Sequence, residues 1–290
     1  MTGWRRVAWL FAPLVLLQAQ EARWLPLSVY AERPVGLKAS DVRVSCGHQA
    51  VPGAKIKTGG GPVSVGIVVQ GSKAMQENTG QAQLALRKFL EHARPGDEFF
   101  TVKSLDAPVL GAGFTAEVNA LVSSITVPPG KRRSRLLDAI TFALDYLGHA
   151  RNTNRALVVI YANDDVASVI KPKDLAYRLL SAHIPVYAVN LCARYADDLV
   201  PVSYELQKLA EQSGGDSWDV SSFAKLGEAL GRVDVRPQYK LWVPATAGTA
   251  CEHEQHLKVD WTPGVEHGGV SLRYQRQWPN GLGLNLPAGR

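Results

Sequence analysis

The segment VSVGIVV, residues 63–69, is the strongest indicator of the fold of this chain. It is an almost unbroken apolar run of mainly β-branched residues, which is typical of a strand buried on both faces of a parallel sheet. Two later stretches have the same character, RALVVIY at residues 155–161 and PVYAVNL at residues 185–191. The three runs together predict one central, mainly parallel sheet. With 46% apolar and 20% charged residues, the chain can bury a core, which excludes wholesale disorder.

Segments with helical periodicity lie between these runs. In residues 81–92, Leu84, Leu86, Phe89 and Leu90 recur at helical spacing, and the Pro-Gly pair at residues 95–96 ends the segment. Further helices are expected over residues 116–125 with Thr115 as N-cap and over 134–147, 174–182, 204–212 and 222–232, with strands over 98–102 and 217–220. This alternation predicts a Rossmann-like α/β domain over residues 62–235. Its helices should cover both faces of the sheet, and ligands should bind at the carboxyl ends of the strands.

The two flanks, residues 24–61 and 236–278, contain short alternating runs and little helical pattern. Each flank is too short to bury a core alone. We therefore expect them to form one small β unit into which the α/β domain is inserted, with strands near residues 25–30, 42–45, 239–243, 256–261 and 270–276. Cys46 and Cys251 fall in this unit and are the candidate disulfide. Residues 279–290 are expected to form a disordered tail.

The N-terminus has the pattern of a signal peptide. Arg5 and Arg6 precede an apolar stretch at residues 7–17, which is short for a membrane span. We expect residues 1–19 to be removed and the chain to be exported, either periplasmic or secreted, with no membrane span left. Removal lowers the net charge from +6 to 30 − 26 = +4. A mildly basic, exported chain does not indicate a nucleic-acid partner.

Four stretches resemble a known family by their order and spacing. They are GLKASD at residues 36–41, IVVQGSKAM at 67–75, PGDEFF at 95–100 and YKLWVP at 239–244. The pattern resembles the von Willebrand factor A (VWA) domain, in the secreted VWFA-related form found in Acidobacteria, over residues 25–278. This resemblance implies a Rossmann-like fold and a role in protein–protein binding.

The resemblance also implies where a Mg²⁺ or Mn²⁺ site would lie, with an Asp and two Ser from the first loop, a Thr from the second and an Asp from the third. In this chain the matching residues are Gln70, Ser72, Ala74, Ser134 and Ala162. Both charged ligands and one hydroxyl are therefore missing. Two neutral hydroxyls do not offset the dehydration of a hard divalent cation. We expect no metal at this degenerate site and no other cofactor.

A basic run, KRRSR at residues 131–135, lies in the second of these loops. In one interpretation, Lys73 and these arginines replace the charge of the ion and receive a carboxylate or phosphate from a partner. In the other, the run is a solvated loop ahead of a helix. Asp164 and Asp165 are displaced from the third-loop position, and are interpreted as a helix-capping or solvated pair or as a partial substitute for the missing ligands.

These features predict an exported, non-enzymatic protein–protein interaction module, used for adhesion or as a scaffold. No G-x-S-x-G nucleophile motif or H-E-x-x-H zinc motif is present. The alternatives are a metal-dependent adhesin or hydrolase, with ligands from Asp164, Asp165 or the His253 and His256 segment, and a scaffold whose α/β domain has no ligand. The expected partner-binding surface is the pseudo-ion site, comprising Gln70, Ser72, Lys73, Arg132, Arg133, Ser134, Asn163 and Asp164.

Overall fold

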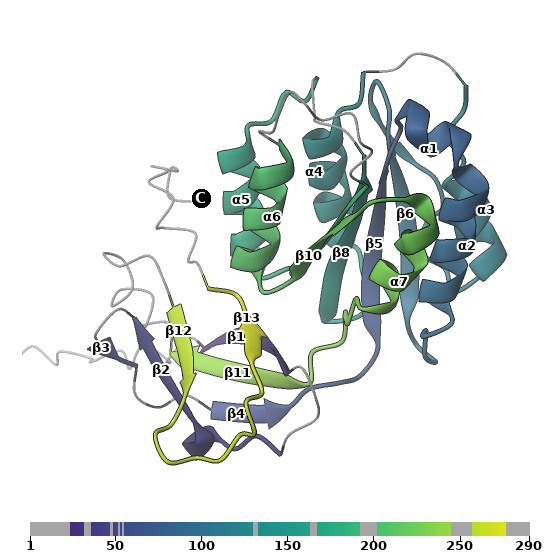
Figure 1. Ribbon diagram of the computed structural model, residues 1–290. Coiled ribbons are helices and arrows are strands. Elements are labelled where there is room, and N and C mark those ends of the chain that lie inside the picture. The colour runs from purple at the N-terminus through teal and green to yellow at the C-terminus, as the bar shows by residue number, and fades with distance from the viewer. Residues whose placement is uncertain are drawn as a thin grey trace, which may run out of the picture.

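The computed structural model describes residues 24–31, 36–46, 49–51, 53, 55–129, 133–162, 167–191, 202–244 and 257–276. Figure 1 shows a larger part, in which helices flank a central sheet, and a smaller β part beside its lower end. The predicted signal peptide, Cys251 and the predicted tail lie outside the described residues. The signal peptide, the disulfide between Cys46 and Cys251 and the disordered tail therefore stay predictions. None of the helices in the described part of the chain combines the length and apolar character that a membrane span requires.

The central sheet of the larger part has six strands in the order β10-β9-β8-β5-β6-β7. All neighbouring strands are parallel except β7, which runs antiparallel to β6. Every residue of the central strand β5 is buried, as its unbroken apolar run predicts. The strands are β5 (Val63–Gln70), β6 (Glu98–Ser104), β7 (Pro108–Leu110), β8 (Asn154–Tyr161), β9 (Val186–Leu191) and β10 (Asp216–Val220).

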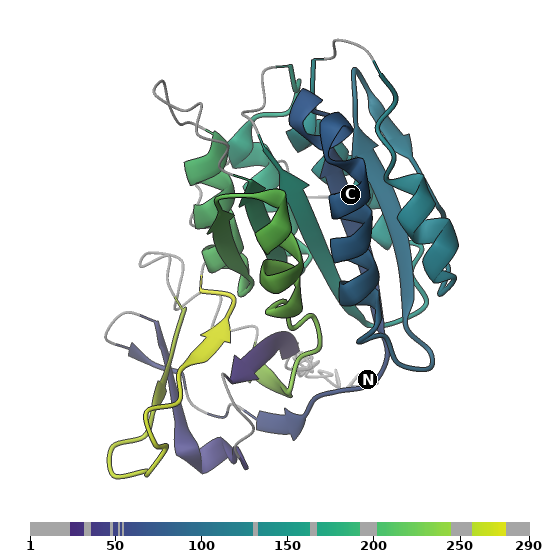
Figure 2. The same ribbon diagram turned by 45° about the vertical axis from the view of Figure 1, so that its right-hand side comes forward.

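Helices cover both faces of this sheet (Figure 2), which confirms the predicted α/β class. One face packs against α1 (Lys73–Glu77), α2 (Thr79–Leu90), α3 (Val118–Ser124) and α7 (Leu226–Gly231). The other packs against α4 (Leu136–Leu147), α5 (Pro172–Ser181) and α6 (Val202–Ser213). A 3-10 turn, η2 (Phe223–Lys225), leads into α7. Two-sided burial is therefore achieved with separate apolar cores above and below the sheet.

One local expectation is wrong, and one strand of the central sheet was not predicted. Thr115 does not cap α3, because the helix begins at Val118 and the Thr115 backbone is hydrogen-bonded to Phe99 as an isolated β-bridge. The Thr115 hydroxyl instead accepts a hydrogen bond from the Glu117 N–H at 3.0 Å. Strand β7 was not predicted, because its three residues are too short to show an alternating pattern.

The flanks of the chain pair with each other and form two sheets. A four-stranded sheet has the order β13-β1-β11-β4 and a three-stranded sheet the order β12-β2-β3. Antiparallel pairs β1–β11 and β2–β12 each join an N-terminal to a C-terminal strand, and a shared apolar core lies between the sheets. The elements are β1 (Trp24–Ala31), η1 (Ala39–Asp41), β2 (Val42–Cys46), β3 (Gln49–Ala50), β4 (Lys55–Thr58), β11 (Tyr239–Pro244), β12 (Leu257–Trp261) and β13 (Leu272–Tyr274).

Aromatic and cationic side chains join the β part to the α/β part. Tyr30 of β1 meets Tyr187 of β9 edge to face, with ring centroids 6.3 Å apart. The guanidinium of Arg273 lies over both rings, 5.4 Å and 5.8 Å from their centroids, and pairs with Asp216 at 3.6 Å. Burial raises the pKa of Tyr30 to about 12, so this phenol is neutral at physiological pH.

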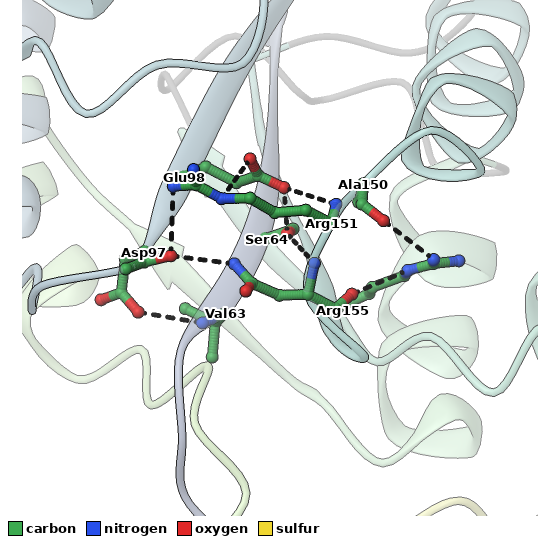
Figure 3. Close-up of polar contacts among 9 residues, drawn as sticks. Val63, Ser64, Asp97, Glu98, Ala150, Arg151 and Arg155 are labelled. Carbon is green, nitrogen blue, oxygen red and sulfur yellow. Dashed lines mark hydrogen bonds and ion pairs between the residues drawn. The ribbon is translucent and has the colours of Figure 1, made fainter.

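Two acidic side chains organise the amino ends of the strands (Figure 3). Glu98 accepts hydrogen bonds from the Ser64 hydroxyl at 2.6 Å and the Arg151 N–H at 2.9 Å, and pairs with the Arg151 side chain at 3.0 Å. Asp97 accepts from the N–H groups of Val63 at 2.9 Å and Arg94 at 2.7 Å. It also pairs with Arg236 at 2.5 Å. Because Val63 begins β5 and Arg236 precedes β11, this one carboxylate fixes both chain crossings between the two parts.

Candidate functional site

The candidate site lies at the carboxyl edge of the central sheet, where β5, β6 and β8 end side by side. Gln70 is the last residue of β5 and pairs in register with Ser104, the last residue of β6. Ala162 follows the end of β8 on the other side of β5. The sheet topology therefore gathers the predicted residues Gln70, Ser72 and Ser134 with Ala162 at one edge, as expected for parallel strands.

The Gln70 side chain bridges two neighbouring strands. Gln70 is fully buried, and its Oε1 accepts a hydrogen bond from the Ala162 N–H at 2.8 Å. These are the two positions at which the VWA resemblance implies metal-binding aspartates. Where two carboxylates would face an ion, a side-chain amide is hydrogen-bonded directly to the backbone of the opposite position.

The two retained hydroxyls are also hydrogen-bonded within the protein. Ser72 caps α1, since its Oγ accepts from the Met75 N–H at 3.2 Å. The Ser134 Oγ is 2.7 Å from the Ser104 Oγ, and either atom could be the donor. Both Ser72 and Ser134 are buried. The sequence did not indicate Ser104, because its only local signal is a polar residue at the end of an apolar strand.

Gly71 allows the first loop to pass close to the end of β6 as it leaves β5. Its N–H donates to the Ser104 carbonyl at 2.8 Å. A Cβ added at Gly71 would lie 2.4 Å from Leu105 Cδ2 and 2.6 Å from the Ser104 carbonyl oxygen. Only glycine permits this approach, which fixes the direction in which Ser72 and α1 continue.

The described cations of the site are exposed and lie next to acidic residues. The Lys73 side chain is 85% exposed and pairs with Glu77 at 3.6 Å along α1. Arg133 is exposed, and its backbone N–H donates to Asp106 Oδ1 at 3.0 Å. These cations do not fill the position between Gln70 and Ala162. Arg132, Asn163 and Asp164 of the predicted surface lie outside the described residues, as do Lys131, Asp165, His253 and His256.

Asp138 is a further residue of this edge that the sequence analysis missed. Its Oδ1 accepts hydrogen bonds from the Val169 N–H and the Ile170 N–H, both at 3.0 Å, and the Ser168 hydroxyl accepts one from the Asp138 N–H at 3.1 Å. Asp138 therefore holds the segment after β8 against the first turn of α4. An acidic residue in the first turn of a helix was the available signal.

In the part of the chain that the structure describes, no group of three or more His, Cys, Asp or Glu side chains is arranged to hold a metal ion.

Comparison with known proteins identifies the fold. No family model matches the sequence, and no curated protein matches it. Among solved structures, proximal thread matrix protein 1 from the mussel byssus, with a zinc-occupied metal-ion-dependent adhesion site, is 13% identical with a TM-score of 0.53. The match covers 66% of this chain and 50% of that one. A von Willebrand factor type A protein from Catenulispora acidiphila is 12% identical with a TM-score of 0.50, covering 88% of this chain and 62% of that one. The helices and central sheet described above therefore have the von Willebrand factor A fold.

Proposed function

We propose that this chain is a non-enzymatic protein-interaction module of the VWA fold whose docking surface, the carboxyl edge of the central sheet, works without a divalent ion. The observation that carries the proposal is the hydrogen bond from the Ala162 N–H to the buried Gln70 Oε1. It joins the two positions that would otherwise supply negative charge to an ion.

The residues present do not fit Mg²⁺ or Mn²⁺. Such an ion requires several oxygen ligands in near-octahedral geometry, usually with at least one carboxylate. Gln70 Oε1 and Ser72 Oγ each accept a backbone N–H, and Ser134 Oγ is hydrogen-bonded to Ser104. Recruiting these oxygens would leave buried polar groups without partners, at about 1–3 kcal/mol each.

The same hydrogen bonds argue against a hydrolase at this edge. A nucleophilic serine needs a base within hydrogen-bonding reach to take its proton. The Ser72 hydroxyl oxygen accepts a hydrogen bond from a backbone amide, and the Ser134 hydroxyl is hydrogen-bonded to another serine hydroxyl. Each hydroxyl thus supports the shape of the edge, which favours an interaction surface over a catalytic one.

Titration calorimetry tests the ion-free site. We expect no saturable heat when the protein is titrated with MgCl₂, MnCl₂ or ZnCl₂. A matched variant, Gln70→Asp/Ala74→Ser/Ala162→Asp, restores the side chains that the family uses and should gain Mg²⁺ or Mn²⁺ binding. Micromolar binding to the unmodified protein would refute the proposal and favour a metal-dependent adhesin.

Site-specific photo-crosslinking tests the docking surface. A photoreactive amino acid at Lys73 or Arg133 should crosslink to a defined partner protein in native extracts. The same residue at exposed Glu91, beyond the far end of α2, should not. Equal crosslinking from all three positions would show that the carboxyl edge has no special role.

The proposal includes export, because adhesion requires the module to leave the cytoplasm. The N-terminal pattern of Arg5, Arg6 and the apolar residues 7–17 supports it. Sequencing the N-terminus of the native protein should find a chain that starts near Gln20. A native protein that keeps residues 1–19 would contradict this part of the proposal.

A further inference from the structure

Strand β4 (Lys55–Thr58) is an edge strand of the four-stranded sheet. It pairs with β11 on one side, and in Figure 1 it lies beneath β11. Lys55, Lys57 and Thr58 are exposed. An edge strand presents unpaired backbone N–H and C=O groups, which makes it a template for a further strand.

The two faces of β4 differ in chemistry. Ile56 pairs with Leu241 and packs on the apolar core of the β part. Lys57 pairs with Lys240, and Lys55 pairs with Trp242. Because side chains alternate along a strand and paired residues share a face, the three lysines and Trp242 lie on the face opposite to that core.

In the described part of the chain, Lys57 and Lys240 place two positive charges on this face. Lys57 and Lys240 stand directly opposite each other, an arrangement that is unfavourable for like charges. Neither has an ion-pair partner among the described residues. Lys240 Nζ donates to the Ser28 hydroxyl at 2.8 Å, and burial lowers the pKa of Lys240. An added carboxylate beside Lys57 would relieve this repulsion.

We propose that β4 is the docking edge for an extended acidic segment of a partner protein, which adds to the sheet as a fifth strand. Backbone hydrogen bonds to β4 would supply affinity, and carboxylates would supply selectivity. Alternate side chains of a strand are about 7 Å apart, so an acid-x-acid pattern matches the spacing of Lys55 and Lys57. The inference concerns a different surface from the carboxyl edge and stands independently of it.

The lysines also decide against a second copy of this chain as the occupant. Two β4 edges brought together would place lysines opposite lysines, which disfavours self-pairing. The same charges favour a partner of opposite sign. Specificity of this kind rests on repulsion of the wrong strand as well as attraction of the right one.

Fluorescence anisotropy with labelled peptides tests the proposal. We expect the full chain to bind Glu-Val-Glu-Val-Glu, and to bind Lys-Val-Lys-Val-Lys at least tenfold more weakly. The variant Lys55→Glu/Lys57→Glu should reverse this preference. The control variant Lys171→Glu/Lys173→Glu changes the net charge equally at two exposed lysines just ahead of and within the first turn of α5, and should leave binding unchanged.

A peptide N-methylated at alternate amides separates strand addition from simple charge attraction. It keeps its carboxylates but loses the donors that one strand edge requires, so its binding should fall at least tenfold. Unchanged binding of this peptide, or equal loss with the Lys171/Lys173 control, would overturn the proposal. So would dimerisation of the unmodified protein that Lys55→Glu/Lys57→Glu abolishes. Charge reversal of Lys73 and Arg133 should not affect peptide binding, which separates this test from that of the carboxyl edge.

Discussion

At the scale of single residues, Gln70 shows how a polar side chain is accommodated at the end of a central strand. A buried amide without a partner destabilises the folded state, so its oxygen must accept a hydrogen bond. The Ala162 N–H, 92 positions away along the chain, provides it. The Gln70 side chain thus joins the loop after β5 to the loop after β8 by a hydrogen bond.

We predict that Gln70→Leu lowers the free energy of unfolding by about 1–3 kcal/mol, because the Ala162 N–H loses its acceptor. Urea denaturation followed by circular dichroism measures the change. Gln81→Leu is the control, since Gln81 is exposed on α2 and the change there should stay within about 0.5 kcal/mol. Equal effects of the two substitutions would show that the Gln70 hydrogen bond adds no stability.

Asp97 is the residue on which both crossings between the two parts depend. It is 2% exposed and accepts from Val63, Arg94 and Arg236, whose side chain is itself 13% exposed. We predict that Asp97→Ala costs about 3–5 kcal/mol, because it leaves the Arg236 charge buried and unpaired. The exposed pair of Glu228 and Arg232 is the control, and Glu228→Ala should cost less than about 1 kcal/mol.

A similar loss from Asp97→Ala and Glu228→Ala in chemical denaturation would contradict this assignment. It would mean that solvent screens the Asp97–Arg236 pair as effectively as a surface pair.

At the scale of elements, Gly66 in the middle of β5 sets the packing of the central sheet. It lies between Phe100 on β6 and Leu157 on β8. A Cβ at Gly66 would approach Phe100 Cζ to 2.5 Å and Leu157 Cδ2 to 2.7 Å. The absent side chain makes room for two large neighbours in the core that faces α4.

We predict that Gly66→Val destabilises the protein by about 1–3 kcal/mol or more through overpacking. Gly80→Ala, at an exposed position of α2, should act in the opposite direction, since nothing lies within 4 Å of the new Cβ and alanine favours helices by about 1 kcal/mol. Thermal unfolding followed by circular dichroism measures both. An unchanged or raised midpoint for Gly66→Val would show that the core adapts without strain.

At the scale of the whole molecule, His183 connects the two parts. It lies between α5 and β9 with φ of 53°, and its Nδ1 is 3.0 Å from Gln275 Oε1, just after β13. The Gln275 side-chain amide donates to the Leu180 carbonyl at 2.9 Å. Burial lowers the pKa of His183, and the nearby Lys240 charge lowers it further, although the hydrogen bond to Gln275 acts in the opposite direction.

This shift in the pKa of His183 makes the free energy of unfolding depend on pH in a definite direction. The folded-state pKa lies below the ordinary 6.5, so the unfolded chain binds the proton more tightly. The contribution of His183 is therefore complete above pH 6.5 and is lost as the pH falls through its folded pKa. We predict that the free energy of unfolding falls between pH 7.5 and pH 5.5. Urea titrations across this range should show a weaker pH dependence for His183→Asn, because asparagine tolerates the left-handed backbone but does not titrate.

An identical pH dependence for the unmodified protein and His183→Asn would show that groups other than His183 cause the loss of stability in acid. The Gln275→Leu variant checks the contact itself. It removes the partner that favours protonated His183, so it should make the acid loss steeper.

The class of the fold and the positions of its main strands could be derived from the amino-acid sequence. A strand that is buried on both faces needs a continuous apolar run such as VSVGIVV, which is visible in the local sequence. The helices between the strands show apolar residues at helical spacing. Residues 70, 72 and 134 could also be placed at one edge, because parallel strands end together. The flanks could be paired in outline, although their division into two sheets could not be seen.

The contacts of these side chains, in contrast, become known only from the folded structure. Gln70 bonds to Ala162, Ser134 to Ser104, and Asp97 to Arg236, across separations of 92, 30 and 139 positions. Such contacts depend on which distant strands and loops come together, and neither segment of a pair shows this by itself. The lysine face of β4 is likewise visible only once β4 is paired with β11. The burial of a residue can be inferred from the apolar pattern around it, whereas polar contacts between distant residues form only when the chain folds.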